Sequence, residues 1–241
     1  MSVTEKKSLM NKKTLALLIA IITIIFVGIS TLMNNSGLSN ISENGSDNQP
    51  LSRSQLSKEL YDEGAHIFPQ SIDVTDVPFI NEEGQAIGKG DNIGKWSFIF
   101  FGYTFCPDIC PTTLAVMQQA WVNLSPEMQA QTQVALVSVD IERDTPEQLQ
   151  TYMNYFEKEF TAFTGNLNSL RSYAAQLNAV YAKVERTDEN GDVDPERGYL
   201  MDHSANITIL DPNGNYYGFI KPPFSPKKML KIITSIENSQ N

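Results

Sequence analysis

The sequence WSFIFFGYTFCPDICPTTL, residues 96–114, joins a run of aromatic and β-branched residues to a pair of cysteines and a following helix. Residues 96–103 are typical of a buried strand because nearly every side chain in them is apolar. Leu114, Met117 and Trp121 recur at helical spacing and predict a helix over 113–124. The two cysteines therefore lie where a buried strand ends and a helix begins.

Strand and helix patterns alternate on both sides of this segment. Helices are predicted over 146–156, 167–180 and 225–236, strands or hairpins over 77–87, 133–139, 181–201 and 206–220, and the short segment 160–164 is ambiguous. Strand and helix alternate first, and a hairpin and a helix come last. This order predicts an α/β domain with a mixed central sheet flanked by helices.

The N-terminal region differs from the rest of the chain. Residues 14–33 contain no charged side chain and are long enough to cross a bilayer, and four lysines precede them. A cleaved signal peptide is the alternative, but this apolar run is longer than is usual for one. We expect a cytoplasmic segment 1–13, a transmembrane anchor 14–33, a flexible linker 34–54 and a domain 55–237. The domain would then lie on the outer, periplasmic side of a bacterial plasma membrane.

The charge balance restricts the classes of partner. The formal net charge is −10, and the lysines near the N-terminus leave the rest of the chain more acidic still. Binding to nucleic acid requires Lys and Arg side chains that displace counterions from phosphates. A nucleic-acid partner is therefore not expected.

Cys106 and Cys110 are the only cysteines of the chain. Four residues apart on a helix, two thiols can share a metal ion or close a disulfide. A helix N-terminus lowers a thiol pKa and favours the thiolate, a soft ligand for Cu(I) or Zn²⁺. Two thiolates are an incomplete ligand set, and the sequence offers two histidines as a third ligand. His203 precedes a late strand and is the better candidate, and His66 is the weaker one.

Three further residues near these positions have both a functional and a structural interpretation. Asp108 could offer an oxygen to Cu(II) or simply begin the helix, where its charge suits the dipole. Asp140, at the end of a strand, could support the site from behind or cap a turn with Arg143 and Asp144. Met201 could offer a thioether, but an apolar side chain on a strand is more often part of the core.

The segments CPDICPTT (106–113), VSVDIERDTPEQL (137–149) and DHS (202–204) together resemble the Sco (SenC) family of copper proteins. The resemblance implies a thioredoxin-like fold and one copper, as Cu(I) or Cu(II), bound by Cys106, Cys110 and His203. It also implies a role in assembling the copper A centre of cytochrome c oxidase. The expected partners are the oxidase subunit that holds this centre, or another copper acceptor, and a thiol reductant.

Two functions and one structural alternative remain open. A copper chaperone would bind and hand over the ion without turning over a substrate, so it would not be an enzyme in the usual sense. A thiol–disulfide oxidoreductase would instead cycle Cys106 and Cys110 between dithiol and disulfide and keep the oxidase cysteines reduced. The structural alternative is a bridging disulfide with an unrelated histidine.

Overall fold

Strand β4 (Trp96–Gly102) lies inside an eight-stranded sheet, and all seven of its residues are buried. This computed structural model describes residues 50–187, 192 and 198–239 of the chain. The strand order is β1-β10-β9-β4-β5-β6-β2-β3. The strands around β4 are β5 (Thr132–Ser138), β6 (Thr161–Thr164), β9 (Ile207–Leu210) and β10 (Tyr216–Ile220), and the outer ones are β1 (Ala65–Ile72), β2 (Phe79–Asn81) and β3 (Ala86–Ile87).

Strand directions confirm the mixed sheet. Strand β4 is parallel to β5, and β5 is parallel to β6, whereas β4 and β9, β9 and β10, and β10 and β1 are antiparallel. The chain connects β4 to β5 through two helices, and β9 to β10 through a tight turn with Gly214 at a φ of 73°. The predicted α/β domain with a mixed central sheet flanked by helices is therefore confirmed.

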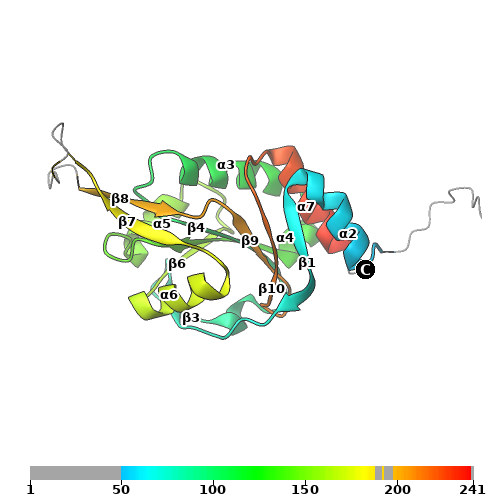
Figure 1. Cartoon of the computed structure of the whole chain (residues 1–241), viewed down its shortest axis with the longest axis horizontal. Coiled ribbons are helices and arrows are strands. Elements are labelled where there is room, and N and C mark those ends of the chain that lie inside the picture. The colour runs from blue at the N-terminus through cyan, green and yellow to red at the C-terminus, as the bar shows by residue number, and fades with distance from the viewer. Residues whose placement is uncertain (1–49, 188–191, 193–197, 240–241) are drawn as a thin grey trace, which may run out of the picture. The chain divides into compact units, whose positions relative to one another are not determined.

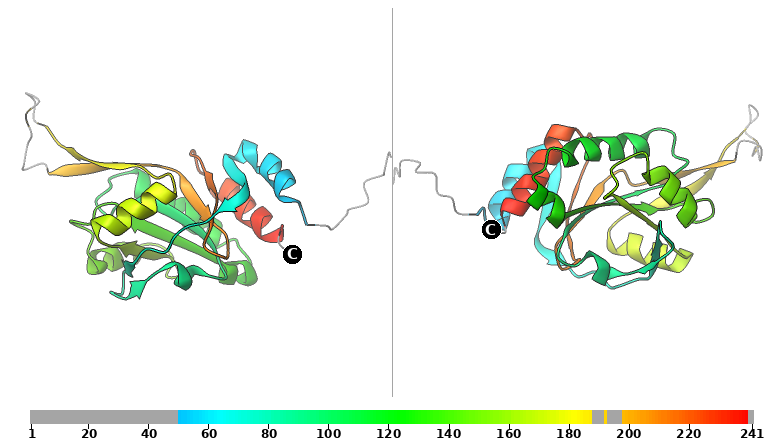
Figure 2. Two further views of the ribbon diagram at one scale, coloured as in Figure 1. Left: turned by 60° about the horizontal axis from the view of Figure 1, so that its bottom comes forward. Right: turned by 180° about the vertical axis from the view of Figure 1, so that it is seen from behind.

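Helices α3 (Ile109–Trp121) and α7 (Pro226–Asn238) pack against each other on one face of this sheet, and α6 (Leu167–Gln176) lies on the other (Figures 1 and 2). Two shorter helices follow α3 in the chain, α4 (Pro126–Gln131) and α5 (Pro146–Met153). Serine or threonine side chains cap α4, α5 and α7, and each of these helices has a proline in its first turn.

A separate hairpin of two strands, β7 (Tyr181–Glu185) and β8 (Tyr199–His203), projects from the sheet (Figure 1). The two strands pair with Tyr181 opposite His203 and Glu185 opposite Tyr199. The predicted hairpin over 181–201 is confirmed, and β8 continues to residue 203. Most of the acidic insertion between its strands lies outside the described residues.

The structure adds elements that the sequence did not reveal, among them α4 and two at the start of the domain. Helix α2 (Arg53–Leu60) is capped by Ser52, so it begins two residues before the predicted domain boundary at residue 55. Strand β1 follows α2 and pairs with β10 at the edge of the sheet. In the described part of the chain no helix has the length and apolar character needed to cross a bilayer. The predicted anchor at 14–33 lies outside those residues.

Candidate metal centre

The cysteine pair belongs to the loop and helix that follow β4. Helix α3 begins at Ile109 with Asp108 at its N-cap, so Cys110 lies in the first helical turn. Cys110 shares the buried face of α3 with Thr113 and Leu114, and it is fully buried. This face continues the apolar stripe seen in the sequence, although the helix begins four residues earlier than predicted. The sulfur of Cys110 therefore points toward the sheet.

Cys106 precedes the helix, which corrects the expectation that both thiols lie on one helical face. The backbone N–H of Cys110 donates to the Cys106 sulfur at 3.4 Å. The Asp108 side chain makes no capping hydrogen bond. The thiol of Cys106 thus occupies the place of a capping group for the free amides at the start of α3. A loop, rather than helical periodicity, brings the two sulfurs together.

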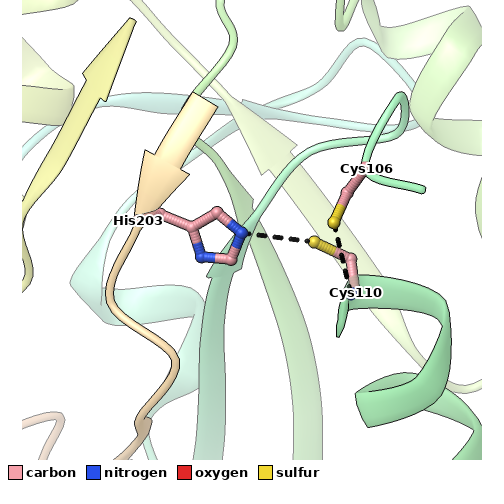
Figure 3. Close-up of side chains that lie close together, drawn as sticks. All are labelled: Cys106, Cys110 and His203. Atoms are coloured by element: carbon pink, nitrogen blue, oxygen red, sulfur yellow. Dashed lines mark hydrogen bonds between the residues drawn. The ribbon is translucent and has the colours of Figure 1, made fainter. Parts of the chain in front are cut away.

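His203 reaches the same place from the end of β8 (Figure 3). Its Nε2 atom lies 3.5 Å from the Cys110 sulfur. The ligand atoms of Cys106, Cys110 and His203 all lie within 4.8 Å of one another. The structure therefore brings together the three residues that the sequence named as copper ligands, from two segments separated by 93 positions in the chain.

Hydrogen bonding fixes which ring nitrogen of His203 faces the thiols. The Nδ1 atom lies 3.1 Å from the carbonyl oxygen of Ser204. A carbonyl only accepts, so Nδ1 carries the proton and Nε2 of the neutral ring keeps its lone pair. The rings of Phe100 and Tyr103 meet the imidazole edge to face, with centroids 5.6 and 5.9 Å away. Nε2 is thus oriented as a ligand or as an acceptor for a thiol proton.

The two thiols have opposite protonation behaviour. The pKa of Cys106 is lowered to about 4, mainly by the hydrogen bond from Cys110 and also by the backbone amides, against the effect of burial. The same hydrogen bond, together with burial, raises the pKa of Cys110. Cys106 is therefore the thiolate of the reduced pair, and Cys110 holds the shared proton.

This asymmetry predicts the pH dependence of alkylation. In the reduced protein the rate of alkylation of Cys106 by iodoacetamide should stay nearly constant from about pH 6 to pH 8, because its thiolate is already formed. An ordinary thiol, with a pKa of about 8.5, reacts roughly tenfold faster for each unit in this range. Peptide mass spectrometry reports each cysteine separately, and Cys110 should stay unmodified under the same conditions. A tenfold rise per pH unit at Cys106 would contradict the assignment.

Gly102, the last residue of β4, permits the close approach of α3. A Cβ atom at this position would lie 2.9 Å from the Cys110 sulfur and 2.9 Å from Cδ1 of Leu136. Both neighbours are fully buried and have little room to move. The sequence shows a glycine within an apolar run but does not show what approaches it.

Gly102→Ala should therefore displace the Cys110 sulfur and lower the free energy of unfolding by about 1–3 kcal/mol, as overpacking in a core does. Urea denaturation of the reduced, metal-free protein measures the change. Gly90→Ala is the matched control, since a Cβ there meets no atom within 4 Å. Equal stability of the two variants would contradict this, because it would show that the neighbours of Gly102 can move aside for a methyl group.

Asp144 fixes the cysteine loop, residues 103–108 between β4 and α3, through buried hydrogen bonds. It is 1% exposed, and it accepts hydrogen bonds from the Thr104 backbone at 3.0 Å and from the Thr104 hydroxyl at 2.7 Å. The hydroxyl of Ser138 donates to it at 2.6 Å. Burial raises the pKa of Asp144, and these donors oppose the rise. The turn chemistry expected around Asp144 thus fixes Thr104, two residues before Cys106.

The other candidates lie outside the three-residue cluster. Asp140 is buried against Arg143 and Tyr199 rather than against the thiols. His66, on β1, stacks on Phe219 with ring centroids 4.9 Å apart, so the weaker histidine candidate belongs to a different part of the sheet. Met201 is buried, as expected for a core residue.

The donor set suits a soft or borderline metal. Thiolate sulfur favours Cu(I), and imidazole nitrogen also suits copper in its oxidised state. Among the described residues this is the one group of three or more His, Cys, Asp or Glu side chains whose ligand atoms converge. Three ligands leave room for an incoming fourth, which a site that exchanges its metal requires.

Comparison with known proteins is consistent with this geometry. A protein-family model described as SCO1/SenC matches residues 72–238. A candidate copper-binding protein of Stutzerimonas stutzeri is 30% identical over 174 residues, which cover 72% of this chain and 81% of that protein. Copper-bound ScoI of Arabidopsis thaliana aligns at a TM-score of 0.59 and 25% identity, over 68% of this chain and 98% of its own.

A more distant structural neighbour shares the fold alone. BsSco aligns at a TM-score of 0.51 and 19% identity, over 70% of this chain and 96% of its own. It is described as a member of the Sco family of cytochrome c oxidase assembly proteins and as containing a disulfide switch.

Proposed function

Because this chain belongs to the SCO1/SenC family, we propose that it binds one copper ion through Cys106, Cys110 and His203 and delivers it to another protein. The observation that carries the proposal is the convergence of two sulfurs and one imidazole nitrogen within 4.8 Å. The tautomer of His203 supports it, because Nε2 presents a lone pair to the thiols.

The chain's own residues suit delivery rather than permanent storage. Cys110 is fully buried, whereas 8% of Cys106 is exposed and His203 is half-buried. An incoming ligand from an acceptor can therefore reach the metal from the side of Cys106 while Cys110 and His203 still hold it. The low pKa of Cys106 keeps this thiol ready to bind Cu(I) without first losing a proton at neutral pH.

The acceptor that we propose is the copper A centre of cytochrome c oxidase. The description of BsSco, which places the Sco family among cytochrome c oxidase assembly proteins, supports this choice. The acidic charge of the chain also favours an acceptor that is not a nucleic acid.

A second function, reduction of the acceptor's disulfide, is favoured by the unequal thiols. The Cys106 thiolate would attack one sulfur of the disulfide, break that bond and form a mixed disulfide. Cys110 would then lose its proton and attack the Cys106 sulfur, which releases the reduced acceptor. The chain is oxidised by two electrons and the acceptor is reduced by two, so a separate thiol reductant must restore the chain.

One experiment separates the two functions. The reduced full chain, loaded with one equivalent of Cu(I), is mixed with the oxidase copper A domain in its reduced, metal-free form, and copper on each protein is measured after separation. Transfer to the domain supports delivery. If copper stays on the chain, but the metal-free chain reduces an oxidised form of the domain, the second function is correct and the first is wrong.

We further propose that residues 14–33 anchor the chain in a bacterial plasma membrane, with the domain on the outer side. The uncharged stretch and the four lysines before it support this topology. Protease added to intact spheroplasts should degrade the domain while a tag fused before residue 1 survives. Protection of the domain would contradict the topology.

A further inference from the structure

The metal-ligand set joins two parts of the fold that no strand pairing connects. The cysteines follow β4 in the central sheet, whereas His203 ends a hairpin whose strands pair only with each other among the described residues. A groove of about 650 Å³ separates the hairpin from α6. The hairpin is therefore not packed on the sheet along its whole length, and something must hold His203 at the thiols.

The pairing pattern identifies which edge of β8 faces the site. The hydrogen bonds from Ser204 to Val180 and from Arg186 to Gly198 place the even-numbered backbone groups of β8 toward β7. Its odd-numbered residues, which include His203, thus turn their backbone groups to the other edge. At that edge Met201 and Tyr103 lie close together: burial raises the pKa of the Tyr103 hydroxyl, and the Met201 backbone opposes this rise.

Arg143 supplies the second contact at this edge. Its Nη1 donates to the carbonyl oxygen of Tyr199 at 3.2 Å, and its guanidinium carbon lies 3.7 Å from the centre of the Tyr199 ring. The Tyr199 hydroxyl donates to Asp140 Oδ1 at 2.7 Å, and Arg143 Nε donates to Asp140 Oδ2 at 2.5 Å. Arg143 and Tyr199 thus contact each other, and both donate to the carboxylate of Asp140, a residue that is 2% exposed.

The same guanidinium also touches the cysteine loop. It lies 4.8 Å from the centre of the Phe105 ring, and Phe105 immediately precedes Cys106. Arg143 thus contacts both segments that carry ligands, Tyr199 on the strand of His203 and Phe105 beside Cys106. A planar guanidinium can stack on two rings and still donate from its edge, and a lysine cannot.

We propose that Arg143, held by Asp140 and Tyr199, is a positioning residue that sets the distance from the His203 imidazole to the two cysteine sulfurs. The proposal rests on the proposed copper function. It gives a role to the stretch VSVDIERDTPEQL, whose Asp140 and Arg143 orient the hairpin while its Asp144 orients the cysteine loop.

Two variants of the full, reduced chain test it. Arg143→Lys keeps the charge and removes the planar fork, and we expect Cu(II) affinity to fall about 10- to 100-fold, the range seen when groups that orient a metal ligand are lost. Tyr199→Phe removes the hydroxyl bonds to Asp140 and, at 3.3 Å, to Glu142, and it leaves the ion pair of Arg143 with Asp140 intact. It should therefore fold and shift affinity in the same direction by less.

The matched control is Glu142→Gln. Glu142 pairs with Lys183 of β7 at 2.8 Å and so also joins this segment to the hairpin, but both side chains are exposed. Glu142 also accepts from the Tyr199 hydroxyl at 3.3 Å, and the amide oxygen of a glutamine can keep this bond. Exposed pairs contribute little, so Cu(II) affinity should stay within about twofold of wild type.

Two readouts separate positioning from general destabilisation. In a double-mutant cycle, Arg143→Lys should add nothing once His203→Ala is present, because the residue acts through the imidazole. In the reduced, metal-free chain, nuclear Overhauser contacts between the rings of His203 and Tyr103 should weaken in Arg143→Lys and persist in Glu142→Gln.

The outcomes are distinguishable. Additive losses in the cycle, or unchanged ring contacts together with unchanged affinity in both Arg143→Lys and Tyr199→Phe, overturn the positioning role alone. If His203→Ala itself leaves Cu(II) binding unchanged, the three-ligand copper site is wrong. The ring contacts in the metal-free chain still decide the role of Arg143 in that case.

Discussion

Cys106→Ser is expected to weaken Cu(I) binding by about 100-fold or more while leaving the fold intact. Metal sites with four ligands contribute about 10–16 kcal/mol, roughly 3 kcal/mol for each ligand, and 1.4 kcal/mol is tenfold in affinity. A hydroxyl is a hard, protonated group and does not replace a thiolate at Cu(I). Competition titration of the reduced protein against a Cu(I) chelator measures the loss.

The structure explains why Cys106→Ser should change metal binding rather than the stability of the fold. The Cys106 sulfur accepts an N–H from Cys110 at the start of α3, and a serine oxygen is a preferred acceptor in that place. Asp108→Ala is the control in the same loop, because the Asp108 side chain makes no capping bond. Cu(I) affinity that survives Cys106→Ser, or that is lost equally in Asp108→Ala, would contradict the assignment of the thiolate.

His203→Ala should have its largest effect on Cu(II). Two thiolates can hold Cu(I) without an imidazole, whereas the oxidised ion favours nitrogen ligands and more than two of them. Loss of one ligand corresponds to roughly 100-fold in affinity by the same estimate. The visible and electron paramagnetic resonance spectra of the Cu(II) protein should change at the same time, since a nitrogen ligand is lost.

The chain provides a matched control in its other histidine. His66 lies on β1, stacked on Phe219 and edge-on to Tyr61, and it does not belong to the ligand cluster. His66→Ala should leave both spectra and both affinities unchanged. Spectra that respond to His66→Ala but not to His203→Ala would show that the third ligand has been misassigned.

The centre of the fold could be predicted because local sequence dominates there. Residues 96–103 are almost all apolar, and Leu114, Met117 and Trp121 mark the buried face of the next helix, so strand, loop and helix follow directly. The turn between β9 and β10 is also fixed by local sequence, because the Asp211 side chain accepts from the backbone N–H groups of Asn213 and Asn215.

The N-terminal elements were missed for physical reasons. Helix α2 buries only Leu56 and Leu60, so its apolar pattern is too sparse to stand out from the polar stretch before it. Strand β1 contains Pro69, which argues against a central strand, and the structure indeed places β1 at the edge. Tertiary pairing with β10, rather than local pattern, makes it a strand.

The three side chains that converge at the candidate site could be named from the sequence, whereas the residues that support them could not. Cys106 and Cys110 are visible as a pair, and the family resemblance supplied His203. Spacing alone could not decide between the two histidines. The contacts of Arg143 with Tyr199 and Phe105 depend on how the hairpin lies against the cysteine loop, which no local pattern encodes. The sequence left open whether Asp140 supports the site or caps a turn, and its partners came only from the fold.

The most direct test of the copper site is X-ray absorption at the copper K-edge of the reduced full chain loaded with one equivalent of copper and then oxidised to Cu(II). We expect two sulfur ligands and at least one imidazole nitrogen, with the imidazole signal lost in His203→Ala and retained in His66→Ala. A copper shell without sulfur, or an imidazole signal that survives His203→Ala, would contradict the three-ligand site.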